Sequence, residues 1–243
     1  MKTLILSDIH ANLSALDAVL SDAGSFDAVW CLGDVVGYGP DPNECVALVR
    51  ELPNLTCLMG NHDAAVLGEI EMDAFNYEAR LGVLWTQQNL HEDNAQFLRE
   101  QVPMVLLEEV TLAHGSPRSP VWEYILDTAT AAANFAYFST PLCFVGHTHV
   151  PAIFDLPKEP AFNTGLIIPE PNTTIALRGR MIINPGSVGQ PRDRDPRAAY
   201  GILDTDRWEF SYRRIPYDIE SVQARMREAG LPPRHIQRLA AGW

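Results

Sequence analysis

Residues 145–151 read VGHTHVP, in which a single threonine separates His147 from His149. If this stretch is extended, successive side chains point to opposite sides, so both imidazoles leave the same face of the backbone. The two histidines could bind one metal ion together, bind two ions with one ring each, or lie at the surface without binding a metal. An HxH pair is too common to separate these alternatives, so the other donor side chains must decide.

Further donor side chains lie in four other short segments, SDIH, GD, GNHD and AHGSP, each at the end of an apolar run. Together with the HTH segment they offer two carboxylates, one amide and four imidazoles: Asp8, His10, Asp34, Asn61, His114, His147 and His149. A mixture of imidazole and carboxylate ligands suits first-row divalent metals. Seven donors exceed the three protein ligands of a typical catalytic zinc ion. They suit two ions, about 3.5–4 Å apart, that share a carboxylate.

Each segment also has an ordinary structural explanation. Asp8 and Asp34 could cap the helices that follow them, a common role for an aspartate after a strand. His10 and His114 could be hydrogen-bonded polar residues at a sheet edge, and the glycines of GD and GNHD could simply form turns. For one segment alone, this explanation is the better one. Caps and turns do not explain why all five segments follow an apolar run.

The apolar runs that precede these segments alternate with helical patterns. Runs at 2–6, 27–32 and 55–59 read as buried strands, while helical spacing follows Asn12, a capping residue type, and spans 41–52. This β-α-β-α-β order predicts a parallel sheet flanked by helices. Ligands of open α/β sheets bind beyond the carboxyl ends of the strands, so we expect the five segments to converge there.

The remainder of the chain combines further helices with a second set of strands. Helical patterns cover 64–101, 128–138 and 218–229, and 104–113 reads as a strand. Turns rich in Gly, Pro and Asp separate RMIIN, AAYGILD and WEFSYRRI, which predicts an antiparallel sheet. The proline-rich stretch 157–171 is expected to be a surface loop. Without a repeat or a long linker, residues 1–243 are expected to form a single domain.

The composition is that of an acidic globular protein. Hydrophobic residues make up 47% of the chain and charged residues 20%, and the formal net charge is −13. This charge disfavours nonspecific binding to nucleic acid or anionic lipid, since both need a basic surface. No apolar run approaches the roughly 18 residues of a membrane span, and Asp8 and His10 come too early for a signal peptide. We therefore expect a cytoplasmic protein without a membrane partner.

The cysteines give no sign of a metal site of their own. Cys31, Cys45, Cys57 and Cys143 form no CxxC pair, so a thiolate zinc site has little support. Three of the four lie inside apolar runs, where a free cysteine behaves as a small core residue. We expect them to be reduced and buried.

The five segments together resemble the calcineurin-like metallophosphoesterase superfamily, in particular its small bacterial phosphoesterases and diadenosine tetraphosphatases. The matching motifs are D-x-H (Asp8, His10), G-D (Gly33, Asp34), G-N-H-D (Gly60 to Asp63), a histidine (His114) and G-H-T-H (Gly146 to His149). INPGSVGQPR at 183–192 resembles the loop that follows in the bacterial proteins. The resemblance implies an α/β fold, a four-layer α/β/β/α sandwich of two mixed β-sheets with the metal site on loops at the strand ends.

The resemblance also implies a metal-dependent phosphoric ester hydrolase. Carried over by position, its ligands are Asp8, His10 and His149 for one ion, Asn61, His114 and His147 for a second, and Asp34 as the bridge. Manganese is the first choice for the two divalent ions, with iron, zinc, nickel or magnesium as alternatives. A hydroxide generated from water at the metals would attack a phosphomonoester, a phosphodiester or a nucleotide (poly)phosphate. His62 would donate a proton to the leaving oxygen or stabilise the transition state.

One motif departs from the protein phosphatases of this superfamily, whose bridging segment reads GDxVDRG, with a second aspartate that orients the catalytic histidine. Here the segment reads GDVVGYG, so Gly37 replaces that aspartate and Tyr38 the following arginine. Asp63 stands where those enzymes have an arginine after GNH. The departure weakens a protein-phosphatase function. Asp63 could act as a second catalytic residue that orients His62, or cap the helix that follows.

Other residues are candidates for binding the substrate, expected to be a small phosphate ester or a nucleotide. Arg192 and Arg194 could contact a phosphate or belong to a solvated loop of Arg–Asp pairs. Tyr38 and the 64–101 region could line the pocket. Gly186 and Gly189 could offer backbone N–H groups to an anion or only form turns. A noncatalytic scaffold for protein partners is disfavoured by the complete ligand set, and a nuclease by the acidic charge. The sequence is compatible with a homo-oligomer.

Overall fold

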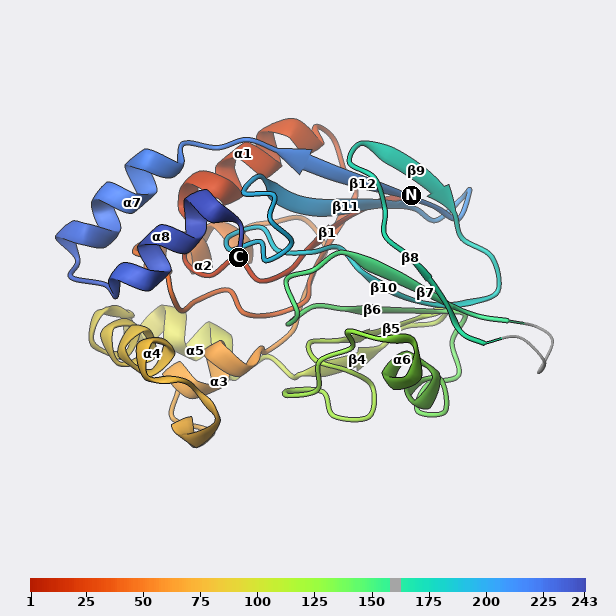
Figure 1. The fold of residues 1–243 in the computed structure, drawn as a ribbon, viewed down its shortest axis with the longest axis horizontal. Coiled ribbons are helices and arrows are strands. Elements are labelled where there is room, and N and C mark those ends of the chain that lie inside the picture. The colour runs from red at the N-terminus through yellow and green to blue at the C-terminus, as the bar shows by residue number, and fades with distance from the viewer. Residues whose placement is uncertain (158–162) are drawn as a thin grey trace.

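Two six-stranded sheets stacked face to face form the centre of the computed structural model, which describes residues 1–157 and 163–243. The strand order is β3-β2-β1-β11-β12-β9 in the first sheet and β4-β5-β6-β10-β7-β8 in the second. Figure 1 shows helix α1 outside the first sheet and helix α6 outside the second, with the sheets between them. This arrangement confirms the predicted α/β/β/α sandwich of two mixed sheets.

The first sheet joins a parallel half to an antiparallel half. Its strands are β1 (Lys2–Leu6), β2 (Ala28–Cys31) and β3 (Leu55–Cys57), which are parallel, and β11 (Ala198–Asp204), β12 (Glu209–Ile215) and β9 (Thr173–Ala176), which are antiparallel. Leu4 and Leu6 of β1 are buried against the outer helices, whereas Ile5 is buried between the sheets. A strand buried on both faces reads as a continuous apolar run, which explains the KTLIL pattern.

The second sheet is also mixed. Its parallel strands are β5 (Val110–Ala113), β6 (Leu142–Val145) and β10 (Arg180–Asn184), and its antiparallel strands are β4 (Met104–Leu106), β7 (Ala152–Leu156) and β8 (Gly165–Ile167). Phe144 of β6 is buried between the sheets, while Cys143 and Val145 are buried on the side of α6. All four cysteines are free and buried, as predicted.

Short helices connect the strands and cover the outer faces of the sheets. Helix α1 (Leu13–Ala23) follows Asn12, whose side chain accepts a hydrogen bond from the N–H of Ala15 at 3.1 Å. The others are α2 (Pro42–Arg50), α3 (Asn61–Val66), α4 (Tyr77–Asn89), α5 (Glu92–Arg99), α6 (Thr128–Asn134), α7 (Ile219–Glu228) and α8 (Pro233–Ala241), with a 3₁₀ turn at Met72–Ala74. Among the described residues, no helix has both the length and the apolar character needed to span a membrane.

Three sequence-based expectations about the strands are corrected by the structure. Residues 104–113 form two antiparallel strands, β4 and β5, because the chain reverses where the N–H of Leu107 donates to the carbonyl of Val110 at 2.9 Å. The RMIIN segment, β10, lies in the second sheet, parallel to β6 and antiparallel to β7, and does not share a sheet with the other two segments, β11 and β12. The expected loop at 157–171 contains β8, and its residues 158–162 lie outside the described part of the chain.

Candidate metal centre

The loops after four strands and the start of α3 bring all seven predicted ligands into one buried cluster. Asp8 and His10 follow β1, Asp34 follows β2, and Asn61 begins α3. The remaining ligands follow β5 and β6 of the second sheet: His114, His147 and His149. Each of the seven side chains is at most 4% exposed. Both sheets therefore contribute predicted ligands from their strand ends, where the alternation of elements predicts a site.

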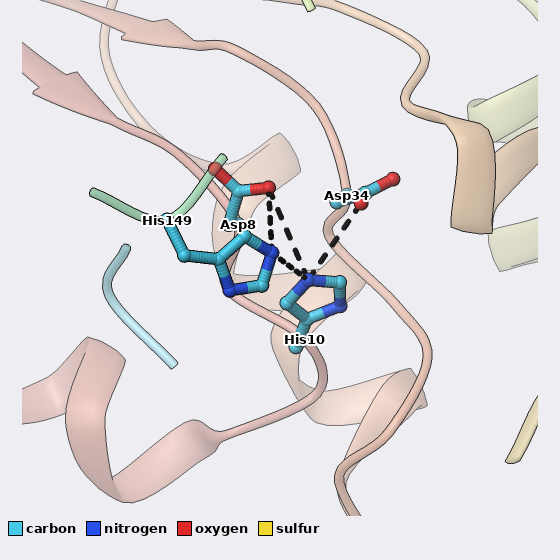
Figure 2. A group of neighbouring side chains, drawn as sticks. All are labelled: Asp8, His10, Asp34 and His149. Carbon is cyan, nitrogen blue, oxygen red and sulfur yellow. Dashed lines mark hydrogen bonds and ion pairs between the residues drawn. The ribbon is translucent and has the colours of Figure 1, made fainter. Parts of the chain in front are cut away.

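One group of donor atoms comes from Asp8, His10, Asp34 and His149, and these atoms lie within 4.8 Å of one another. Figure 2 shows the four side chains pointing toward a common centre. His149 Nε2 lies 3.3 Å from Asp8 Oδ1 and 3.1 Å from His10 Nε2. His10 Nε2 is in turn 3.6 Å from Asp34 Oδ2. Two imidazole nitrogens and two carboxylate oxygens at this spacing could hold one divalent ion.

A second group comes from Asp34, His114 and His147, whose donor atoms also lie within 4.8 Å of one another. His114 Nε2 lies 3.5 Å from Asp34 Oδ2 and 3.2 Å from His147 Nδ1. The side-chain oxygen of Asn61 approaches the same nitrogen at 3.1 Å. Asp34 belongs to both groups, so its carboxylate occupies the position between two candidate ion sites.

Backbone carbonyl groups orient the four imidazoles of the cluster. The ring nitrogen that points away from the centre contacts a carbonyl oxygen in each case: His10 Nδ1 to Val36 at 3.1 Å, His114 Nδ1 to Leu32 at 2.8 Å, His149 Nδ1 to Gln190 at 2.6 Å and His147 Nε2 to Trp122 at 3.2 Å. A carbonyl oxygen only accepts, so this outer nitrogen carries the proton. The inner nitrogen then presents a lone pair to the centre, as metal-binding histidines do.

Two carboxylate oxygens in the cluster have no hydrogen-bond partner. Asp8 Oδ2 accepts from the hydroxyl of Ser7 at 2.6 Å and from the N–H of His147 at 3.0 Å, but Asp8 Oδ1 is unpaired. Asp34 Oδ1 accepts from the N–H of His62 at 2.8 Å, and Asp34 Oδ2 is unpaired. A buried charged oxygen without a partner is costly. These two oxygens, facing nitrogen lone pairs, fit the requirements of bound cations.

The electrostatics of the cluster agree with this donor set. Burial, followed by the positive charges of neighbouring groups, lowers the pKa of His10, His147 and His149, which favours neutral rings. Burial, together with the nearby charges of Asp63 and Asp8, raises the pKa of Asp34. Neutral imidazoles cannot compensate a carboxylate, so the protein's own side chains leave Asp34 without a counter-charge at the centre.

The HTH segment reaches the cluster by a route that the sequence did not predict. Strand β6 ends at Val145, and His147 and His149 have φ angles of 64° and 60°, in the left-handed region. The expectation of an extended segment with alternating side chains is therefore wrong. The turn nevertheless sends one imidazole to each donor group. Thr148 accepts a hydrogen bond from Asn184 at 3.0 Å and so points away from the centre.

His62 lies beside the cluster with its ring packed among other rings. Its ring centroid is 4.2 Å from that of Tyr38 and 4.9 Å from those of His10 and Phe75. Gly37 has a φ of 90°, and a Cβ atom there would lie 2.6 Å from His62 Nδ1. Gly37, which stands where the protein phosphatases have their orienting aspartate, thus lies directly against the His62 ring. There is no space for a side chain at this position.

Asp63 caps α3 and does not orient His62. Its Oδ1 accepts the N–H of Val36 at 3.0 Å, and its Oδ2 accepts the N–H of Gly60 at 2.9 Å. Both oxygens are therefore engaged by backbone groups of the loops that carry Asp34 and Asn61. These contacts support the alternative expectation, that Asp63 caps α3. They contradict the expectation that Asp63 is a second catalytic residue that orients His62.

An open cavity adjoins the cluster at Asn61 and His62. Two expected substrate-binding residues, Tyr38 and Arg192, line it. Phe75 belongs to the 64–101 region, which was also a candidate for lining the pocket, whereas sequence reasoning missed three lining residues: Trp122, Tyr124 and Arg238. An aromatic pair just after AHGSP was the available signal for Trp122 and Tyr124, and nothing in the motifs pointed to Arg238.

Three other candidates for anion binding do not line this cavity. Arg194 is exposed, and its backbone N–H donates to the carbonyl of Gly242 at 2.6 Å. The N–H of Gly186 donates to Asn184 Oδ1 at 2.8 Å, and the N–H of Gly189 donates to the carbonyl of Asp8 at 3.0 Å. These two glycines therefore hold the 184–190 loop against the cluster instead of offering N–H groups to a ligand.

The sequence and the fold of this chain both match known proteins. The sequence profile of the calcineurin-like phosphoesterase superfamily domain matches residues 1–207. The chain belongs to this superfamily. A crystal structure of a metallophosphoesterase from Sphaerobacter thermophilus has 48% sequence identity and a TM-score of 0.91, over 100% of this chain and 99% of that chain. Membership of this phosphoesterase superfamily supports a hydrolase.

Other relatives extend the comparison. An uncharacterized protein of Methanocaldococcus jannaschii is 36% identical over 247 residues, covering 98% of this chain and 97% of that protein. A hypothetical protein of Pyrococcus horikoshii shares the fold, with a TM-score of 0.80 at 18% identity over 100% of this chain and 98% of that chain. A symmetrical bis(5'-nucleosyl)-tetraphosphatase of Pectobacterium atrosepticum is 32% identical over 143 residues, which cover 55% of this chain and 49% of that protein. The similarity to tetraphosphatases therefore spans only about half of either chain.

Proposed function

We propose that this superfamily member is a phosphoesterase that depends on two divalent metal ions. The supporting observation is that Asp34 belongs to both donor groups, while Asp8 Oδ1 and Asp34 Oδ2 are buried without a partner. The proposed ligands are Asp8, His10 and His149 for one ion, Asn61, His114 and His147 for the other, and Asp34 for both. The proposed ions are first-row divalent metals, because the donors combine imidazole nitrogen with carboxylate and amide oxygen, and manganese is the first choice among them.

The two ions would supply Lewis-acid charge and lower the pKa of a bound water that serves as the nucleophile. The protein's own residues would position the ester. His62 is fixed by its backbone hydrogen bond to Asp34 and projects from the first turn of α3 beside the cavity. We assign it contact with the leaving oxygen, where it stabilises developing charge. Arg192, held by Gln190 at 3.0 Å and by the Tyr38 hydroxyl at 3.4 Å, would balance the charge of the phosphate.

The proposed substrate is a small phosphate ester or a nucleotide (poly)phosphate. The partial similarity to symmetrical tetraphosphatases supports a nucleotide substrate, and the net charge of −13 disfavours a nucleic-acid polymer. Protein-phosphatase activity is not proposed. The aspartate that those enzymes use to orient their histidine would need space at Gly37, where a Cβ already meets the His62 ring at 2.6 Å.

Turnover of bis(p-nitrophenyl) phosphate and p-nitrophenyl phosphate, with added Mn²⁺ and with chelator, tests the proposal. We expect metal-dependent turnover in the parent protein, and a loss of both turnover and bound metal in Asp34→Asn and His147→Ala. Absence of metal-dependent turnover, combined with parental metal content in both variants, would instead favour a noncatalytic scaffold. The ratio of diester to monoester turnover would then narrow the substrate class.

A further inference from the structure

Two arginines from different parts of the chain face the cavity beside the metal centre. Arg192 lies in the loop after β10, and Arg238 lies on α8. The match to the superfamily profile ends at residue 207, so α8 lies outside the residues that the profile matches. Helix α8 therefore contributes a cation to a cavity that the superfamily motifs only partly enclose.

Neither arginine forms an ion pair with a carboxylate in the described parts of the chain. Arg192 donates only to neutral oxygens, and the Nε atoms of both Arg192 and Arg238 are buried without a partner. By contrast, Arg225 on the neighbouring helix α7 binds Asp41 at 2.9 Å. An anionic group in the cavity that both residues line would supply the counter-charge that the two guanidinium groups lack.

The two charges act on each other beside the metal centre. Burial lowers the pKa of Arg238, and the charge of Arg192 lowers it further. Arg192 and Arg238 line the same cavity as His62. In a chain with a net charge of −13, this pair of cations forms a local positive region next to the reacting centre.

Backbone hydrogen bonds hold the two arginines in a fixed relation. The N–H of Gly242 donates to the carbonyl of Arg238 at 2.8 Å, and the N–H of Arg194 donates to the carbonyl of Gly242 at 2.6 Å. The end of α8 is thus tied to the segment that carries Arg192. Leu239 of α8 also packs with Met226 of α7 in a buried apolar cluster. These contacts fix the backbone positions of the two arginines relative to each other.

We propose that Arg192 and Arg238 form a subsite for a second anionic group of the substrate, and that α8 thereby selects esters with more than one phosphate. The proposal rests on the proposed phosphoesterase function. The phosphate under attack would lie at the metal centre beside Asn61 and His62. The next phosphate of a diphosphate or polyphosphate chain would extend along the cavity to the two guanidinium groups, which can each donate two parallel hydrogen bonds.

The test compares the affinities of the metal-loaded, full-length chain for inorganic phosphate and pyrophosphate, measured by calorimetry at a fixed free Mn²⁺ concentration. We expect pyrophosphate to bind about tenfold more tightly than phosphate, because hydrogen bonds between charged groups contribute about 1.5–3 kcal/mol. Arg238→Gln should remove most of this preference and leave phosphate affinity within about twofold. Arg238→Lys keeps the charge and should show an intermediate preference.

Arg234→Gln is the matched control, since it removes the same charge from an exposed position of α8 that does not line the cavity. It should retain the parental preference. An equal loss in Arg234→Gln, or a parental preference in both Arg238 variants, would overturn the proposal. Turnover of bis(p-nitrophenyl) phosphate is measured in parallel: absence of turnover in the parent contradicts the phosphoesterase function, whereas turnover without a preference for pyrophosphate contradicts the subsite alone.

Discussion

Replacing Asp34 with asparagine should stabilise the metal-free protein and abolish the stability that metal provides. Asp34 Oδ1 accepts the N–H of His62 at 2.8 Å, and the side-chain oxygen of asparagine can do the same. Asp34 Oδ2 is unpaired and lies 3.6 Å from His10 Nε2 and 3.5 Å from His114 Nε2. The amide nitrogen of asparagine would remove the buried charge and place a donor opposite two nitrogen lone pairs.

The magnitude follows from the cost of the unpaired oxygen. Relieving an unsatisfied buried polar group contributes about 1–3 kcal/mol, and each kcal/mol shifts the Tm of a chain of this size by about 2–4 °C. The Tm of metal-free Asp34→Asn should therefore exceed that of the parent by about 2–12 °C. Burial and the charges of Asp63 and Asp8 raise the pKa of Asp34 in the folded state. The parent protein should therefore lose stability as the pH rises from 3.8, the ordinary pKa of an aspartate, through the raised pKa of Asp34. Asp34→Asn has no carboxyl group at this position and should not show this pH-dependent loss of stability.

Differential scanning calorimetry with chelator and with Mn²⁺ measures both effects. At a metal concentration of 100 times Kd, the parent should gain about 2.7 kcal/mol, and Asp34→Asn should gain little. Asp63→Asn is the control, because both oxygens of this buried carboxylate already accept N–H groups. It should lose stability with or without metal. The reasoning is refuted if Asp34→Asn is less stable than the parent in chelator, or if metal stabilises the two proteins equally.

Three further substitutions test individual parts of the site. Gly37→Ala places a Cβ 2.6 Å from His62 Nδ1 at a φ of 90° and should lower kcat about tenfold while metal content by mass spectrometry stays parental. Asp63→Ala removes two hydrogen bonds that join Val36 and Gly60 and should lower the free energy of unfolding in urea by about 1–2 kcal/mol; an unchanged midpoint would contradict the capping role. The ring of Tyr124 stacks on His147 at 4.1 Å, so Tyr124→Ala should weaken metal affinity up to about tenfold in a competition titration with a chelating dye, whereas Tyr124→Phe should not.

The sequence predicts the parallel half of the first sheet and the convergence of the donor residues well, because both depend on local patterns. The last three residues of the KTLIL run are apolar because this part of β1 is buried on both faces, and the donors follow it closely. The order of β1, β2 and β3 then requires Asp8 and Asp34 to lie at the same sheet edge, because the three strands are parallel. Asn12 predicts the start of α1 for the same local reason.

The missed features depend on tertiary contacts. The left-handed conformation of His147 and His149 is imposed by the packing of their loop, including the bond from His147 N–H to Asp8, and no HxH spacing predicts it. The sequence alone does not show whether Asp63 caps α3 or orients His62. The hydrogen bond from the N–H of Val36, which lies in another loop, decides for the capping role. Arg238 enters the cavity because α8 is tied to the distant 193–195 segment through Gly242, a contact without a motif.

The central claim is that the seven side chains hold two ions bridged by Asp34. Anomalous X-ray diffraction from crystals grown with Mn²⁺ tests it most directly in the parent, in His147→Ala and in His149→Ala. The parent should show two peaks about 3.5–4 Å apart on either side of Asp34, with His149→Ala losing the peak near Asp8 and His10, and His147→Ala losing the peak near His114. A single peak in the parent, or loss of the same peak in both variants, would contradict a dinuclear centre.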